Sequence, residues 1–190
     1  MKVFEGIDGK LADWIRAQAM FFVGTAPAGA EGHVNVSPKG PIGCLAIGGP
    51  HEVAYLDHLG SGSETIAHLR ENGRICVLFC AFQGPPRIVR LHGRGEVLQV
   101  GTPGFDAAAA RFGFSAGPGS RSIIRVDVER VADSCGYDVP LMAFEGARPQ
   151  RADWQAVQVR KHGEGALVDY IRQNNATSID GLPAVDVERL

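Results

Sequence analysis

Two long β-type segments joined by a short connection constrain the fold of this chain more than any other feature. They cover residues 74–82 and 87–100, and only the four residues QGPP separate them. Apolar, β-branched and aromatic residues are frequent in both segments, as is typical of strands. Gly93 and Gly95 lie inside the second segment. They predict a bulge or sharp bend, which is common where a sheet closes on itself.

The remaining segments indicate a mainly β protein with a few peripheral helices. Further strands are expected at residues 20–26, 32–36, 44–47, 52–56 and 121–134. Helical spacing of apolar residues predicts helices at 9–19, 61–72, 102–113 and through 152–175, followed by a non-periodic tail. Six or seven strands with short helices favour a small β-barrel. A parallel α/β fold is disfavoured because helices do not alternate with every strand.

Composition restricts the classes of function. The 190 residues fit one domain of ordinary size, with 45% hydrophobic and 21% charged residues. A net charge of −2 argues against a nucleic-acid binder, and no apolar run approaches the roughly 20 residues that span a membrane. The amino terminus has no signal-peptide pattern. Four cysteines without secretion signals indicate free thiols and a cytoplasmic protein. No Cys-x-x-Cys or His-Glu-x-x-His spacing occurs, so no metal site is expected.

The stretch HVNVSPKG, residues 33–40, alternates polar and apolar side chains. This pattern predicts a half-buried strand with an unusually polar second face. Pro38 and Pro41 place it at a strand end or sheet edge. Ser37 and Lys39 share the polar face and supply a hydroxyl and an ammonium, two groups suited to a phosphate. A solvated surface lysine is the alternative interpretation.

The stretch YLDHLGSGSETIAHLREN, residues 55–72, predicts a strand, a glycine-rich turn and a helix that begins at Ser61 or Ser63. Ser61 and Glu64 have capping-box spacing. The unpaired amides of a helix amino terminus attract anions, and Ser63 and Thr65 can add hydroxyl donors. An ordinary capped helix is the alternative interpretation.

The stretch RIVRLHGRG, residues 87–95, is dense in cationic groups. Arg90, His92 and Arg94 share one face of the expected strand, and Arg87 lies on the other. Guanidinium groups suit phosphate or carboxylate geometry. An exposed edge protected by charge is the alternative.

Together, VNVSPKG, VAYLDHLGSGSETIAHLRENGRICVLF and RIVRLHGRGEVL resemble the pyridoxamine 5'-phosphate oxidase-like FMN-binding split barrels. The resemblance covers about residues 15–130. It implies a six-stranded split β-barrel with peripheral helices, and a homodimer that holds FMN in clefts between its subunits. The expected organisation is a barrel over residues 1–135, with a helical extension and tail over residues 136–190 packing on the same domain.

The resemblance also assigns cofactor-binding residues. Ser37 and Lys39 match the strand whose basic residue meets the flavin or its phosphate. The strand, turn and helix that hold the phosphate and ribityl chain correspond to Tyr55, Asp57, Ser61, Ser63 and Thr65. Arg87 and Arg90 match a strand that reaches FMN, often from the partner subunit.

Two departures affect the expected substrate. The oxidase itself carries a glutamine where this chain has Ile88, and it ends in a motif containing tryptophan and Arg-x-His, which the tail here lacks. The resemblance therefore implies an FMN-dependent oxidoreductase acting on a small organic substrate other than pyridoxamine phosphate. Because flavin chemistry needs no protein acid or base, no catalytic residue is assigned. The alternatives are a non-catalytic flavin-binding redox sensor or storage protein, and a barrel that binds F420 or haem.

Overall fold

The computed structural model describes residues 1–40 and 43–190. Pro41, predicted at a strand end or edge, lies outside these ranges. The described residues form eight strands: β1 (Lys2–Phe4), β2 (Phe21–Thr25), β3 (Asn35–Lys39), β4 (Leu45–Gly49), β5 (Glu52–His58), β6 (Arg74–Cys80), β7 (Ile88–Gln99) and β8 (Ser120–Ser134). The helices are α1 (Gly9–Arg16), α2 (Glu64–Asn72), α3 (Pro103–Phe112), α4 (Gln150–His162), α5 (Ala166–Asn174) and the 3-10 helix η1 (Val187–Arg189).

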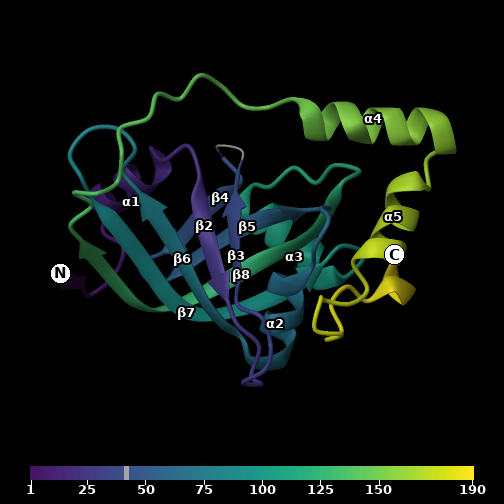
Figure 1. The fold of residues 1–190 in the computed structure, drawn as a ribbon, viewed down its shortest axis with the longest axis horizontal. Helices are drawn as coiled ribbons and strands as arrows, with labels where there is room; N and C mark the ends of the chain where they lie inside the picture. The colour runs from purple at the N-terminus through teal and green to yellow at the C-terminus, as the bar shows by residue number, and fades with distance from the viewer. Residues whose placement is uncertain (41–42) are drawn as a thin grey trace.

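All strand pairs in this sheet are antiparallel, and the strand order is β3-β2-β6-β7-β8-β5-β4, with β1 added to β8. The two end strands of this order, β3 and β4, do not pair with each other, so the curved sheet is a split barrel (Figure 1). The predicted fold class is confirmed. The sheet has more strands than the expected six because seven of the predicted segments form strands and the three-residue β1 adds another.

The hairpin of β6 and β7 fixes the middle of the sheet. After the exposed Arg74, residues of β6 alternate between buried and half-buried, and Val77 and Phe79 point into the core. The pairing of β7 with β8 changes register between His92 and Gly93, which confirms the bulge predicted from the glycines. A Cβ on Gly93 would lie 2.0 Å from the carbonyl oxygen of Asp127. This position therefore requires glycine because the two strands approach so closely.

Strand β3 presents its polar side chains to the barrel interior. Among the described strands it pairs only with β2 and is thus an edge strand, one of the two positions that Pro38 predicts. Asn35, Ser37 and Lys39 are half-buried, whereas Val36 is 67% exposed and Val34, just before the strand, is 73% exposed. In most half-buried strands the apolar face points inward, whereas in β3 the polar face does. The polar groups on this inner face therefore need hydrogen-bond partners within the protein.

Helix α2 begins next to Ser63, the second of the two predicted starts, and not at Ser61. Its first residue is Glu64 and its N-cap is Ser63, whose side chain makes no capping bond. The predicted capping box of Ser61 and Glu64 is therefore wrong, because Ser61 lies two residues before the N-cap position that it would have to occupy.

The carboxy-terminal part returns to the barrel after a long excursion. Residues 135–149, which contain no helix or strand, lead from β8 to α4, which projects from the barrel (Figure 1). The predicted helical region is two helices, since Gly163 ends α4 with a φ of 88°. Four buried residues after α4 belong to the barrel's hydrophobic core: Leu167, Ile171, Ala184 and Val185. The domain boundary at residue 135 remains a prediction. Among the described helices, none combines the length and apolar character needed to cross a membrane.

Candidate functional site

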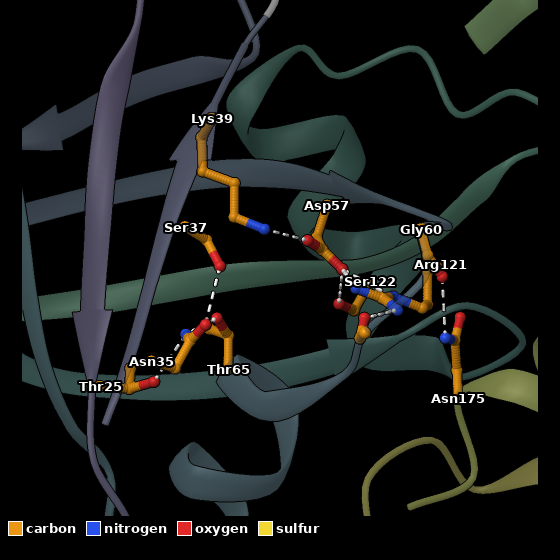
Figure 2. Close-up of polar contacts among 11 residues, drawn as sticks. Thr25, Asn35, Ser37, Lys39, Asp57, Gly60, Thr65, Arg121, Ser122 and Asn175 are labelled. Atoms are coloured by element: carbon orange, nitrogen blue, oxygen red, sulfur yellow. Dashed lines mark hydrogen bonds and ion pairs between the residues drawn. The ribbon is translucent and has the colours of Figure 1, made fainter. Parts of the chain in front are cut away.

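A buried cluster of three charged side chains lies at the opening of the barrel. The Asp57 carboxylate accepts hydrogen bonds from Arg121 at 2.8 Å and from the Lys39 ammonium at 3.1 Å (Figure 2). The side chains of Asp57 and Arg121 are only 2% and 4% exposed, whereas that of Lys39 is 19% exposed. Two cations thus share one carboxylate, and the excess positive charge lies on the group that reaches solvent.

Strand order explains why this cluster marks the opening. Lys39 lies on β3, at one end of the order, and Asp57 lies on β5, next to the other end. Arg121 lies on β8, the neighbour of β5, where Asp57 is opposite Ser122. The ion pair of Lys39 and Asp57 therefore joins the two sides of the split, at a place where the backbone supplies no pairing.

The cluster keeps Asp57 ionised. Burial alone would raise the pKa of this carboxyl group, but the nearby charges of Arg121 and Lys39, with their hydrogen bonds, outweigh burial and lower the pKa below its ordinary value of 3.8. Asp57 is thus an anion at neutral pH, and it holds Lys39 in place from beneath.

The ring of Tyr55 forms a further part of the support for Lys39. The Lys39 ammonium lies over this ring, 5.8 Å from its centroid, within the range of a cation–π contact. Tyr55 is completely buried, and its hydroxyl oxygen has no hydrogen-bond partner among the described residues. Burial raises the pKa of Tyr55 well above 10, with a further contribution from Asp57. The residue acts as a neutral aromatic support.

A cleft lies beside the Lys39 ammonium. A polar recess of about 160 Å³ contains Lys39, Asp57, His58 and Arg151. An adjoining and more apolar cavity of about 520 Å³ shares Lys39 and Arg151 and also contains Phe144. This volume lies within the roughly 300–1,000 Å³ of typical small-molecule sites. A charged recess beside an apolar cavity suits a ligand with an anionic group on an apolar body.

A second polar network supports the inner face of β3. The Asn35 amide donates to the hydroxyls of Thr25 and Thr65 at 3.1 and 2.9 Å, and accepts from Ser37 at 2.9 Å (Figure 2). Thr25 in turn contacts Nδ1 of the buried His68 at 3.0 Å. Because this network satisfies the polar face, Ser37 and Thr65 hold the strand in position rather than leaving their groups free.

The glycine-rich turn before α2 is covered by the carboxy-terminal tail. The Ser63 hydroxyl donates to the carbonyl of Thr177, and the Asn175 amide donates to the carbonyl of Gly60. The third guanidinium nitrogen of Arg121, which does not contact Asp57, donates to the carbonyl of Gly62 at 2.8 Å. Ser63 is therefore buried beneath the tail. Ser61, which is exposed, forms no side-chain hydrogen bond within the described residues.

The resemblance assigns Arg87, just before β7, and Arg90, on β7, to the cofactor site, but both side chains lie away from the Lys39 cluster. Arg87 pairs with Asp133 at 3.1 Å and stacks over the ring of Trp14. Arg90 donates to the hydroxyl of Ser134 at 3.0 Å. Register places Arg90 opposite Leu78, on the outer face of the sheet, while Leu91 beside it points into the core. Within one chain, neither arginine joins the cluster of Lys39.

The structure thus brings together Lys39, Tyr55 and Asp57, and joins Ser37 to Thr65 through Asn35. Sequence patterns did not identify Arg121 or Arg151 as site residues. One sequence feature could have identified Arg121 as a site residue: it is an arginine next to a run of apolar strand residues that are fully buried in the structure. Asp57, the partner of Arg121, is 64 residues away in the sequence, so the ion pair between them becomes visible only once β5 is known to pair with β8. Arg151 lies in a segment without strand periodicity.

Fold and site together define a small split-barrel protein with a cationic cleft at its opening. Residues 7–135 match the family model of pyridoxamine 5'-phosphate oxidase. The chain belongs to this family, as the sequence resemblance predicts. Within the described residues, no group of three or more potential metal ligands lies together.

One known protein of this family is similar to the chain in sequence, and two solved structures share its fold. The pyridoxamine 5'-phosphate oxidase family protein ustO of Aspergillus flavus is 40% identical over 192 residues, which cover 96% of this chain and 77% of that protein. Two crystal structures of HupZ from Group A Streptococcus share the fold at 21% identity. The first, of a substituted form of HupZ, has a TM-score of 0.53, and the match covers 67% of this chain and 99% of that chain. The second has a TM-score of 0.52, with coverage of 67% and 93%.

Proposed function

We propose that this protein is an FMN-dependent oxidoreductase that acts on a small organic substrate other than pyridoxamine phosphate. The observation that carries the proposal is the cationic cleft at the barrel opening, where Lys39 is held by Asp57 and exposed to the cavity. Family membership supports the flavin. The altered position Ile88 and the tail without an Arg-x-His motif support a different substrate.

The residues of the cleft fit the cofactor. The recess beside Lys39 is polar and small, which suits a phosphate, and the adjoining cavity has the apolar character that an isoalloxazine ring needs. When bound, the flavin would supply the electron-transfer chemistry. Lys39 would hold the phosphate, while Asp57 and Arg121 fix the ammonium and the strand ends around it.

Replacing Lys39 with alanine should weaken FMN binding by about 1–3 kcal/mol, because a charge-assisted contact to the phosphate is lost. Quenching of flavin fluorescence measures the dissociation constant. Lys10→Ala is the matched control because Lys10 is exposed on α1, away from the cleft. Equal FMN affinity in both variants would place the phosphate elsewhere.

The enzyme proposal is tested by the visible spectrum of the purified protein and by anaerobic mixing with NADH or NADPH. Bound FMN that is bleached by either donor and reoxidised by an added acceptor supports an oxidoreductase. Tight flavin binding without turnover across a panel of donors and acceptors would instead indicate a redox sensor or storage protein. Uptake of F420 or haem in place of FMN would contradict the cofactor assignment.

We also propose a homodimer with the cofactor sites at its interface. The outer face of edge strand β3 carries exposed Val36, and exposed Val34 lies just before the strand. An exposed apolar edge favours association. Arg90 on the outer face of the same sheet would then approach the partner's cleft. Light scattering should give the mass of a dimer, and Val36→Asp should shift the protein toward the monomer. A wild-type monomer at micromolar concentration would contradict this assignment.

A further inference from the structure

Two arginines outside the matched family region face the cleft from the carboxy-terminal part. Arg148 and Arg151 are exposed residues that line the cavity of about 520 Å³ together with Lys39, and Arg151 also lines the polar recess. Arg148 belongs to the segment that leads to α4, and Arg151 is the second residue of that helix. The family model ends at residue 135, so neither arginine belongs to the region that defines the family.

The described residues that line the cavity of about 520 Å³ include no acid that would balance these charges. Within the described residues, neither Arg148 nor Arg151 forms an ion pair or a side-chain hydrogen bond. Asp57 is the one acid among the described residues that line the recess or the cavity, and it already has two cationic partners. Glu145 and Asp153 are close in sequence and exposed, as both arginines are, but neither acid lines the cleft.

The position of the two arginines at the amino-terminal end of α4 also favours a bound anion. The amino terminus of a helix carries partial positive charge, so cations near it are unfavourable unless an anion is present. Arg148 and Arg151 flank this end of α4, where Asp153 is the acid of the first turn. Arg151 also affects its neighbours: burial first, and then Arg151, lowers the pKa of His58.

We propose that Arg148 and Arg151 form, together with Lys39, a binding site for an organic anion with an apolar body and a phosphate or carboxylate group. The guanidinium groups match the planar geometry of such anions, and Met20 and Phe144 supply the apolar wall. The part that this site plays in turnover rests on the proposed function. The binding of the anion does not.

The charged group is either the flavin phosphate or the anionic group of the substrate, and binding measurements distinguish them. The variant Arg148→Ala/Arg151→Ala is compared with Arg160→Ala/Lys161→Ala, which removes two exposed cations from the other end of α4. The probes are FMN, riboflavin and, with FMN-loaded protein, the aromatic anion anilinonaphthalene sulfonate.

If the arginines hold the flavin phosphate, the first variant should bind FMN at least about tenfold more weakly and riboflavin as before, as expected for lost charge-assisted bonds. If they hold the substrate anion, FMN affinity should persist while the sulfonate binds about tenfold more weakly. Both results support the site. Should the wild type take up no flavin, the proposed function fails and sulfonate binding to the unloaded protein decides the site alone. Affinities for FMN and the sulfonate that match those of the control variant would overturn it.

Discussion

Replacing Asp57 with asparagine should lower the free energy of unfolding by about 3–5 kcal/mol, the usual cost of removing one partner of a buried ion pair. The variant leaves the guanidinium of Arg121, whose side chain is 4% exposed, without its carboxylate. It also removes the ion pair that joins β3 to β5 across the barrel opening. Urea denaturation at neutral pH measures the difference.

A double variant separates charge from packing. Asp57→Leu/Arg121→Met removes both buried charges, and it should recover part of the stability because apolar pairs of similar volume replace buried ion pairs at little cost. The recovery is not complete, because the Lys39 ammonium and the Gly62 carbonyl lose their partners. A loss below about 1 kcal/mol for Asp57→Asn alone would show that the cluster is not a buried structural pair.

The pH dependence of this effect has a defined sign. The folded-state pKa of Asp57 is lower than its ordinary value of 3.8. The carboxylate therefore contributes its full stabilisation above about pH 4, and loses it as the pH falls through the folded-state value. The stability difference between the wild type and Asp57→Asn should be constant near neutrality and decrease in acid.

Gly93→Ala should destabilise the protein by about 2–4 kcal/mol, because overpacking that moves backbone is among the costly substitutions. The added Cβ would lie 2.0 Å from the carbonyl oxygen of Asp127, which is backbone of the paired strand β8. Neither strand can move without breaking the longest pairing in the sheet. Thermal and urea denaturation measure the loss.

Gly24→Ala provides the matched control. Gly24 is also a strand glycine, but its Cβ would lie 3.9 Å from the nearest atom, the carbonyl oxygen of Cys76. This variant should stay within about 1 kcal/mol of the wild type, since no neighbour has to move. Equal losses for the two variants would mean that the bulge at Gly93 tolerates a side chain.

Local sequence patterns predicted most of the barrel because its strands are regular. Glycines in the 87–100 segment predicted a bulge or sharp bend, and Pro38 predicted a strand end or sheet edge; the structure has a bulge and an edge strand. Of the two predicted starts of α2, Ser61 was wrong, because capping-box spacing at Ser61 does not reveal that Ser63 is the N-cap residue and donates to Thr177. That contact joins residues 114 positions apart, which no local pattern contains.

The site could be predicted only in part for the same reason. Polar alternation in β3 identified Lys39, and the strand before the glycine turn identified Asp57. Arg121 lies beside Asp57 because β8 pairs with β5 in the sheet. Arg151 lies at the recess because the chain returns to the barrel opening after β8. The inward orientation of β3 was not predicted either, because alternation defines two faces and does not say which face is inside.

The central claim is that groups from β3, β5, β8 and the start of α4 meet at one anion-binding cleft. A crystal structure of the protein with FMN tests it most directly. We expect the phosphate within hydrogen-bond distance of the Lys39 ammonium, with Asp57 still paired to Arg121 beneath it. Density for the flavin phosphate on another surface, with the cleft beside Lys39 holding no part of the ligand, would contradict the claim.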